Sequence, residues 1–170
     1  MNSVLITRET DYALRILRAL ADGGRMTTEE ICREEQLPRQ FAYKILKKLE
    51  QAGLVGISRG AEGGCRLRAD LKRVSLYDLT SVMGGDRAVS ACMQAGYRCA
   101  RRESSGTGCQ VHLQLLEVQR ALDRELRSRS LYRMLYGPGG ESAGKAPHTG
   151  EPPPPAGRFS IDVPDSRKND

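Results

Sequence analysis

The pattern of apolar and polar residues in the first part of the chain predicts three successive helices. The first is expected at 10–21, where apolar side chains recur at helical spacing and two glycines follow. The second begins at the hydroxyl caps of 27–28 and closes near Leu37. The third begins at Pro38, which suits a first helical turn, and stops at Gly53.

The third predicted helix has two distinct faces. We expect its buried stripe to consist of Phe41, Ile45, Leu46 and Leu49. We expect its outward face to consist of Arg39, Gln40, Tyr43, Lys44, Lys47 and Lys48. The helix therefore packs on one side and presents a basic surface on the other.

A strand-turn-strand unit is expected directly after the third helix. Residues 54–58 and 65–68 have the character of short strands, and the glycine-rich stretch 59–64 joins them as a turn. Three helices followed by such a hairpin make a winged helix. A fourth helix is expected at 75–83, where apolar residues line one side and two glycines follow.

The second half of the chain combines a cysteine-bearing loop with a long helix. Weak periodicity over 86–108 predicts the loop, and a helix is expected from residue 109 or 110 to about 136. The apolar stripe of that helix consists of Val111, Leu115, Val118, Leu122 and Leu126. One helix that projects from a small domain cannot bury this stripe alone. We therefore expect antiparallel packing against the same helix of a second subunit, in a homodimer.

The predicted fold class is mainly α with a small β-wing: a winged helix-turn-helix plus a long C-terminal dimerisation helix. We expect a DNA-binding domain at 1–74, a cysteine loop and dimerisation helix at 75–136, and a disordered Pro- and Gly-rich tail at 137–170. Neither a membrane-spanning apolar run nor the features of a secretory signal are found, so we expect a cytoplasmic protein with no membrane partner.

Positive charge is concentrated in the third helix and the hairpin. The chain of 170 residues has a net charge of +6, and residues 39–73 alone hold 9 basic and 3 acidic side chains. The tail at 137–170 holds 4 basic and 5 acidic side chains and adds no positive charge. This distribution predicts a polyanion-binding face on the third helix and hairpin.

Double-stranded DNA is the polyanion that such a fold binds. The second helix of a helix-turn-helix pair enters the major groove, and its N-terminal residues meet the base edges. The base contacts expected from the third helix are Gln40, Tyr43 and Lys44. The phosphate contacts expected from it are Arg39, Lys47 and Lys48. Arg59, at the tip of the hairpin, suits a narrow minor groove. Taken singly, the helix and the hairpin could be ordinary solvated surfaces, but their combination favours DNA binding.

Three features occur together in an order that is specific to one group of proteins. The motif Thr10-Asp11-Tyr12-Ala13-Leu14-Arg15 opens the chain, the hairpin reads Arg59-Gly60-x-x-Gly63-Gly64, and cysteines lie between the fourth helix and the long terminal helix. In this order they resemble the IscR/NsrR-type family of iron-sulfur regulators, also called the Rrf family. The resemblance covers about 5–136. It implies a dimeric winged-helix repressor that binds promoter DNA and carries a cluster near the subunit interface.

The cysteine segment reads Cys92-x6-Cys99-x9-Cys109, and its second gap is wider than is usual in that family. Thiolates are the preferred ligands of iron-sulfur clusters. The resemblance implies a two-iron or four-iron cluster held by these three cysteines and a fourth ligand of another type. His112, one helical turn after Cys109, matches the histidine of IscR-type sites, and Asp11, supplied by the partner subunit, matches the carboxylate of NsrR-type sites. The sequence leaves both open.

Several other interpretations of these residues remain. The three cysteines with His112 could be free thiols or a zinc site, and Asp11 could be a helix cap. Within the same fold, a family member without a cluster could be regulated by thiol oxidation or by a partner protein. Cys32 and Cys65 are expected to be small buried residues. An enzyme is not expected, because the sequence has no Cys-x-x-Cys, no phosphate-binding glycine loop and no nucleophile paired with a base.

Overall fold

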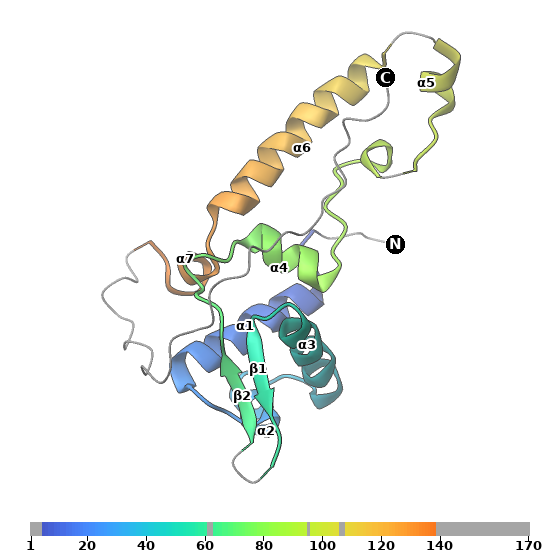
Figure 1. Ribbon diagram of the computed structural model, residues 1–170. Coiled ribbons are helices and arrows are strands. Elements are labelled where there is room, and N and C mark those ends of the chain that lie inside the picture. Colours follow the sequence, from blue (N-terminus) through green and yellow to red (C-terminus); the bar gives the residue numbers. More distant parts are fainter. Residues whose placement is uncertain (1–4, 61–62, 95, 106–107, 139–170) are drawn as a thin grey trace.

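The computed structural model describes residues 5–60, 63–94, 96–105 and 108–138. Helices α1 to α4 and the hairpin form the body of the molecule, and α6 extends away from it (Figure 1). The elements are α1 (Arg8–Gly23), α2 (Thr28–Glu34), α3 (Arg39–Gln51), β1 (Val55–Ser58), β2 (Gly64–Leu67), α4 (Leu76–Met83), the 3-10 helix η1 (Ala91–Met93), α5 (Ala100–Ser105), α6 (Gln110–Ser128) and α7 (Leu131–Tyr136).

Side-chain caps fix where the helices of the body begin. The hydroxyl of Thr7 accepts a hydrogen bond from the N–H of Thr10 at 3.2 Å, so α1 starts earlier than the predicted residue 10. Helix α2 begins with a capping box of Thr27 and Glu30, and a capping box also starts α4. These side chains satisfy N–H groups that have no partner inside the first turn.

Helices α1, α3 and α4 enclose the apolar core with the first residues of β1. The largest fully buried side chains include Ile16, Leu17, Leu20, Ile31, Ile45, Leu46, Leu49, Leu54, Leu79 and Leu131. The prediction that Phe41 belongs to the buried stripe of α3 is wrong, because its side chain is 36% exposed and Ala42 is fully buried instead. The Phe41 ring lies edge-on to Tyr12 of α1, with centroids 6.0 Å apart, at the rim of the core.

Strands β1 and β2 form the predicted antiparallel wing, with Gly56 opposite Arg66 and Ile57 opposite Cys65. The chain between α1 and α2 joins this sheet through Met26, whose N–H donates to the carbonyl of Cys65 at 3.0 Å and whose carbonyl accepts from Cys65 at 2.7 Å. The wing is therefore anchored to the helical body close to its turn, because Cys65 is one residue pair from the Ser58–Gly64 end of the sheet. The predicted winged helix-turn-helix, mainly helical with a two-stranded wing, is confirmed.

At position 63, in the turn of the wing, there is no room for any side chain larger than that of glycine. A Cβ atom there would lie 2.7 Å from the carbonyl oxygens of both Ser58 and Gly60. The N–H of Gly63 donates to the Gly60 carbonyl at 2.8 Å, which closes the turn. Gly60 itself has a φ of +100°, a conformation that L side chains rarely adopt.

The single long helix predicted up to residue 136 is wrong, because the chain breaks into α6 and α7. Residues at the break pair with the start of α4: the N–H of Leu76 donates to the Arg129 carbonyl at 2.8 Å, and the N–H of Leu131 donates to Val74 at 2.8 Å. Ser130 then caps α7. The hydrogen bonds to the residues around the start of α4 replace those that a continuous helix would form here. They also place Leu131 in the core, where it is fully buried.

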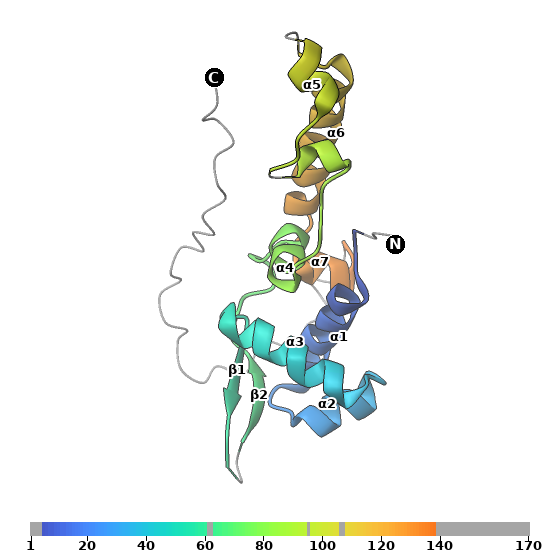
Figure 2. The same ribbon diagram turned by 90° about the vertical axis from the view of Figure 1, so that its right-hand side faces the viewer.

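Helix α6 projects from the body on the side opposite the wing (Figures 1 and 2). The predicted loop at 86–108 contains η1 and α5, so that prediction was incomplete. Along α6, Val111 is 66% exposed and Val118 is 53% exposed. Most of the predicted disordered tail, 139–170, lies outside the described residues. Among the helices that are described, none is both long enough and apolar enough to span a membrane.

Candidate nucleic-acid interface and cysteine segment

The N-terminal half of α3 presents polar side chains opposite its buried stripe. Tyr43 is 52% exposed, and Gln40, Lys44 and Lys47 are exposed as well. Within the described part of the chain, the side chains of Gln40 and Lys47 form no hydrogen bond or ion pair. These groups are available to a partner that lies along α3.

Two carboxylates from other helices contact this face. Glu9 of α1 accepts hydrogen bonds from the ammonium groups of Lys44 and Lys48, each with an N···O distance of 2.6 Å. Glu29 of α2 accepts hydrogen bonds from the guanidinium of Arg39 and, at 3.3 Å, from the hydroxyl of Tyr43. Each carboxylate thus binds two of the side chains predicted to contact DNA.

These contacts favour the ionised form of both carboxyl groups. Hydrogen bonds from Lys44 and then Lys48 hold the pKa of Glu9 below its usual value. The pKa of Glu29 is also lowered, first by a backbone N–H and then by Arg39. Neither carboxylate was among the residues predicted to belong to this face. No local pattern indicates Glu9, because its partners lie 35 and 39 residues away.

Lys48 differs from the other predicted phosphate contacts in its surroundings. Its side chain is 29% exposed, and besides Glu9 it donates to the carbonyl of Met83 at 3.0 Å. Met83 is the last residue of α4. The ammonium group therefore joins α1, α3 and the end of α4, whereas Arg39 and Lys47 are exposed.

The wing carries two arginines of interest. Arg59, at the tip, is exposed as predicted. Arg68, beyond the end of β2, extends along the wing over Gly56, where a Cβ would lie 2.5 Å from its Nε. Gly56 therefore makes room for the Arg68 side chain, which was not among the predicted DNA contacts.

The three cysteines of the segment after α4 are free and partly exposed. Cys92 lies in η1 and its thiol is 3.4 Å from the hydroxyl of Ser90, Cys99 precedes α5, and Cys109 is the N-cap residue of α6. Within residues 5–60, 63–94, 96–105 and 108–138, no three His, Cys, Asp or Glu side chains gather in a group that could hold a metal ion. Thiols suit an iron-sulfur cluster by type, but a single chain in this arrangement does not bring them together.

The two candidates for a fourth ligand lie in different parts of the molecule. His112 is half-buried in the first turn of α6, next to Cys109. Asp11 lies in the first turn of α1, where its carboxylate pairs with Arg15 at 3.0 Å. The alternative that Asp11 caps this helix is wrong, because the cap is Thr7.

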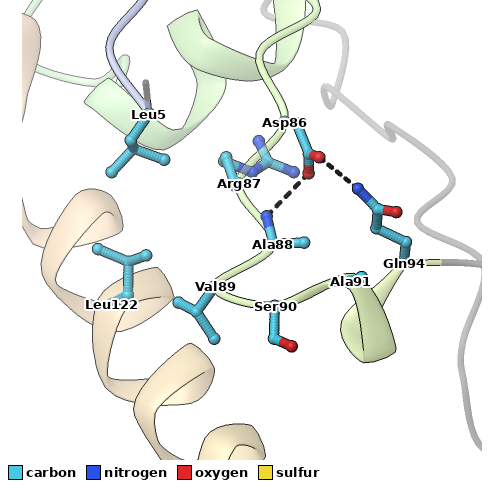
Figure 3. Close-up of a pocket in the computed structure, with 9 residues that line it drawn as sticks. All are labelled: Leu5, Asp86, Arg87, Ala88, Val89, Ser90, Ala91, Gln94 and Leu122. Atoms are coloured by element: carbon cyan, nitrogen blue, oxygen red, sulfur yellow. Dashed lines mark hydrogen bonds between the residues drawn. The ribbon is translucent and has the colours of Figure 1, made fainter. Parts of the chain in front are cut away.

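The segment that leads to Cys92 is fastened to α6. The amide of Gln119 accepts a hydrogen bond from the N–H of Val89 at 2.9 Å and donates one to the carbonyl of Arg87 at 3.0 Å. Beside this contact lies an open hollow of about 530 Å³, which Leu5, Leu122 and residues 86–91 of the segment line together with Gln94 (Figure 3). Its lining is about as polar as it is apolar. The two hydrogen bonds of Gln119 therefore hold the segment before Cys92 against α6.

The remaining cysteines belong to the core of the helical body. Cys32 is 8% exposed and Cys65 is 2% exposed, which confirms their predicted burial. Burial raises the pKa of both thiols. Both are therefore kept in the less reactive protonated form.

The helical body, its wing and the basic face of α3 define the class of protein as a winged-helix DNA-binding protein. The chain belongs to the Rrf2 family, whose profile is described as an iron-dependent transcriptional regulator and matches residues 6–137. The resemblance predicted from the sequence is confirmed. Membership places the chain among transcriptional regulators and not among enzymes.

Two relatives illustrate the similarity in sequence. An rrf2-like HTH-type transcriptional regulator of Rhodobacter capsulatus is 31% identical over 121 residues, which are 67% of this chain and 81% of the relative. Protein aau3 of Rhizobium meliloti is 36% identical over 93 residues, which are 54% of this chain. The match spans 60% of the length of aau3.

Solved structures show the same fold at lower identity. CymR, the global cysteine regulator of B. subtilis, has a TM-score of 0.57 at 22% identity, with 79% of this chain and 97% of CymR covered. IscR of T. potens has a TM-score of 0.55 at 20% identity, with 78% of this chain and 86% of IscR covered. This likeness supports the winged-helix architecture with a C-terminal helix.

Proposed function

We propose that the chain is a homodimeric repressor that senses redox state, nitric oxide or iron-sulfur status through a cluster held by Cys92, Cys99 and Cys109. One observation carries this proposal: three partly exposed thiols lie on the single stretch that joins α4 to α6. That stretch is fastened to α6 through Gln119. A chemical change at the thiols therefore acts on α6, and through α6 on the relative position of two subunits.

Double-stranded promoter DNA is the proposed partner of α3 and the wing. The exposed N-terminal half of α3 suits the major groove, and the exposed Arg59 at the wing tip suits the minor groove. The proposed contacts are Arg39, Gln40, Tyr43, Lys44, Lys47, Lys48 and Arg59. A regulator with this partner acts where the chromosome is, which in a bacterium is the cytoplasm.

The proposed dimer forms along α6. Rrf2 regulators bind DNA, commonly as dimers. The exposed Val111 and Val118 lie on one face of a helix that projects from the body, and a second copy of the same face would remove them from water. Two winged helices on one dimer would then contact two half-sites of an operator.

Iron-sulfur clusters occur in some Rrf2 regulators, and the donor set of this chain is compatible with one. Because the thiols lie apart in the single chain, the segment 92–109 must close up to ligate a cluster. His112 of the same chain or Asp11 of the partner subunit is the proposed fourth ligand. A bound cluster would supply redox chemistry and would link this segment to the first turn of α6.

The iron and acid-labile sulfide of anaerobically purified protein test this proposal. We expect both in the wild type, and loss of both in C92S, C99S and C109S, since each removes a thiolate ligand. C32A is the matched control, because it changes a buried cysteine of the body and should leave the iron content unchanged. Of H112A and D11A, the variant that lowers the iron content identifies the fourth ligand. A wild type without iron and sulfide after reconstitution would contradict the proposal.

A second candidate is a cluster-free regulator controlled by thiol oxidation or by a partner protein. It is favoured by the separation of the three thiols in the described chain. Wild-type protein without iron whose DNA affinity nevertheless changes with a thiol oxidant would support this second candidate.

We assign the functions to three parts of the chain. Residues 1–74 form the DNA-binding part, 75–136 form the sensing and dimerisation part, and 137–170 form a tail without an assigned role. The backbone pairing between Ser75 and Ser130 lies where the first two parts meet, so we propose that a movement of α6 reaches the body through it.

A further inference from the structure

Glu9 and Glu29 place two negative charges on the face of α3 that is proposed to contact DNA. Binding to a polyanion does not require acidic residues there. The two glutamates come from α1 and α2, yet both carboxylates reach the same face of α3. Between them they bind Arg39, Tyr43, Lys44 and Lys48. Most of the hydrogen-bonding groups at the start of this helix are therefore paired within the protein before any DNA arrives.

We propose that Glu9 and Glu29 lower the affinity of the protein for DNA of arbitrary sequence by holding these cations until better contacts replace them. The inference rests on the proposed placement of α3 against the duplex. It adds two acidic residues to a site otherwise described by its basic ones, and it gives them the role of limiting non-specific binding.

The physical basis is competition between carboxylate and phosphate for the same donors. Non-specific binding comes almost entirely from phosphate neutralisation by Lys and Arg. A phosphate that approaches Lys44 must displace Glu9, and it meets the repulsion of a carboxylate 2.6 Å from that ammonium. An operator adds contacts to base edges that offset this cost, whereas a random sequence does not.

The exposure of the paired groups makes the exchange of partners feasible. The side chains of Arg39 and Lys44 are 63% and 59% exposed, so each can turn from its carboxylate to a phosphate. Glu9 is only 25% exposed and is held by a second lysine, so it stays in place while Lys44 leaves. Lys48 keeps the Met83 carbonyl as a partner in either case. Each carboxylate therefore restrains chiefly one exposed cation.

E9Q and E29Q test the inference, and E117Q is the matched control. Glu117 pairs with Arg120 on α6 at 2.6 Å, so E117Q changes the net charge equally but away from α3. The probe is a fluorescein-labelled duplex of random sequence, and its affinity is measured by anisotropy over a series of KCl concentrations. We expect E9Q and E29Q to bind it about threefold to tenfold more tightly than E117Q at low salt. The slope of log affinity against log salt should steepen by about 0.9 for each cation set free.

The outcomes separate this inference from the proposed function. A wild type and charge-removed variants that all fail to bind the duplex at low salt would overturn the proposed placement of α3. Wild-type binding with E9Q and E29Q equal to E117Q in affinity and slope would overturn the inference alone. Thermal melts establish that the variants fold, and E29Q, whose carboxylate is exposed, keeps the test valid if E9Q is unstable.

Discussion

At the scale of single residues, the chain has two kinds of cysteine that differ in burial, as the sequence predicted. Cys32 and Cys65 lie in the core with a raised pKa, whereas Cys92, Cys99 and Cys109 are partly exposed. The distinction is physical: a thiol away from water ionises less readily and a reagent reaches it slowly. Only the partly exposed group is suited to respond to a signal.

Alkylation of the metal-free protein tests this distinction. Brief treatment with iodoacetamide under native conditions should modify Cys92, Cys99 and Cys109, while Cys32 and Cys65 should react only after denaturation, because burial keeps them protonated and out of reach. Intact mass and peptide mapping report the sites. Rapid native labelling of Cys65 would show that the pairing of β2 with Met26 opens more readily than this structure implies.

At the scale of elements, the wing depends on a turn that glycine alone can make. G63A places a methyl group 2.7 Å from two carbonyl oxygens, so the turn must open and Arg59 must move. Because the turn lies outside the core, we expect a nearly unchanged melting temperature and an affinity for duplex DNA reduced about threefold or more. G85A is the control, since a Cβ there lies 3.5 Å from its nearest neighbours, an ordinary contact distance. Equal DNA affinity for the two variants would exclude the wing tip from the interface.

Periodicity predicted the helices of the body because each packs one face against a shared core. It failed at the break between α6 and α7. Leu126 and Leu131 are both buried and therefore fit an unbroken apolar stripe, whereas the break is caused by backbone pairing with the residues around the start of α4. It also misjudged Phe41, whose large ring lies at the rim while the small Ala42 packs inside. The DNA-contact residues could be proposed from charge and position. Glu9 and Glu29 could not, because their partners come from another helix.

At the scale of the whole molecule, the account requires two copies joined along α6. V118E places a charge on the exposed apolar face, so the protein should sediment as a monomer and bind DNA more weakly. L113E is the matched control, because Leu113 is also exposed, at 48%, but lies on the opposite face of the same helix. Analytical ultracentrifugation measures both variants. A V118E protein that remains dimeric while L113E dissociates would place the interface on the other face.

The central claim is that the state of the cysteine segment controls where this protein binds DNA. The most direct measurement is to incubate sheared genomic DNA with anaerobically purified protein, before and after iron is removed by a chelator, and to sequence the fragments that are retained. The account predicts a defined set of fragments that share a two-fold symmetric sequence in one state and are lost in the other. Retention that is the same in both states and independent of sequence would contradict it.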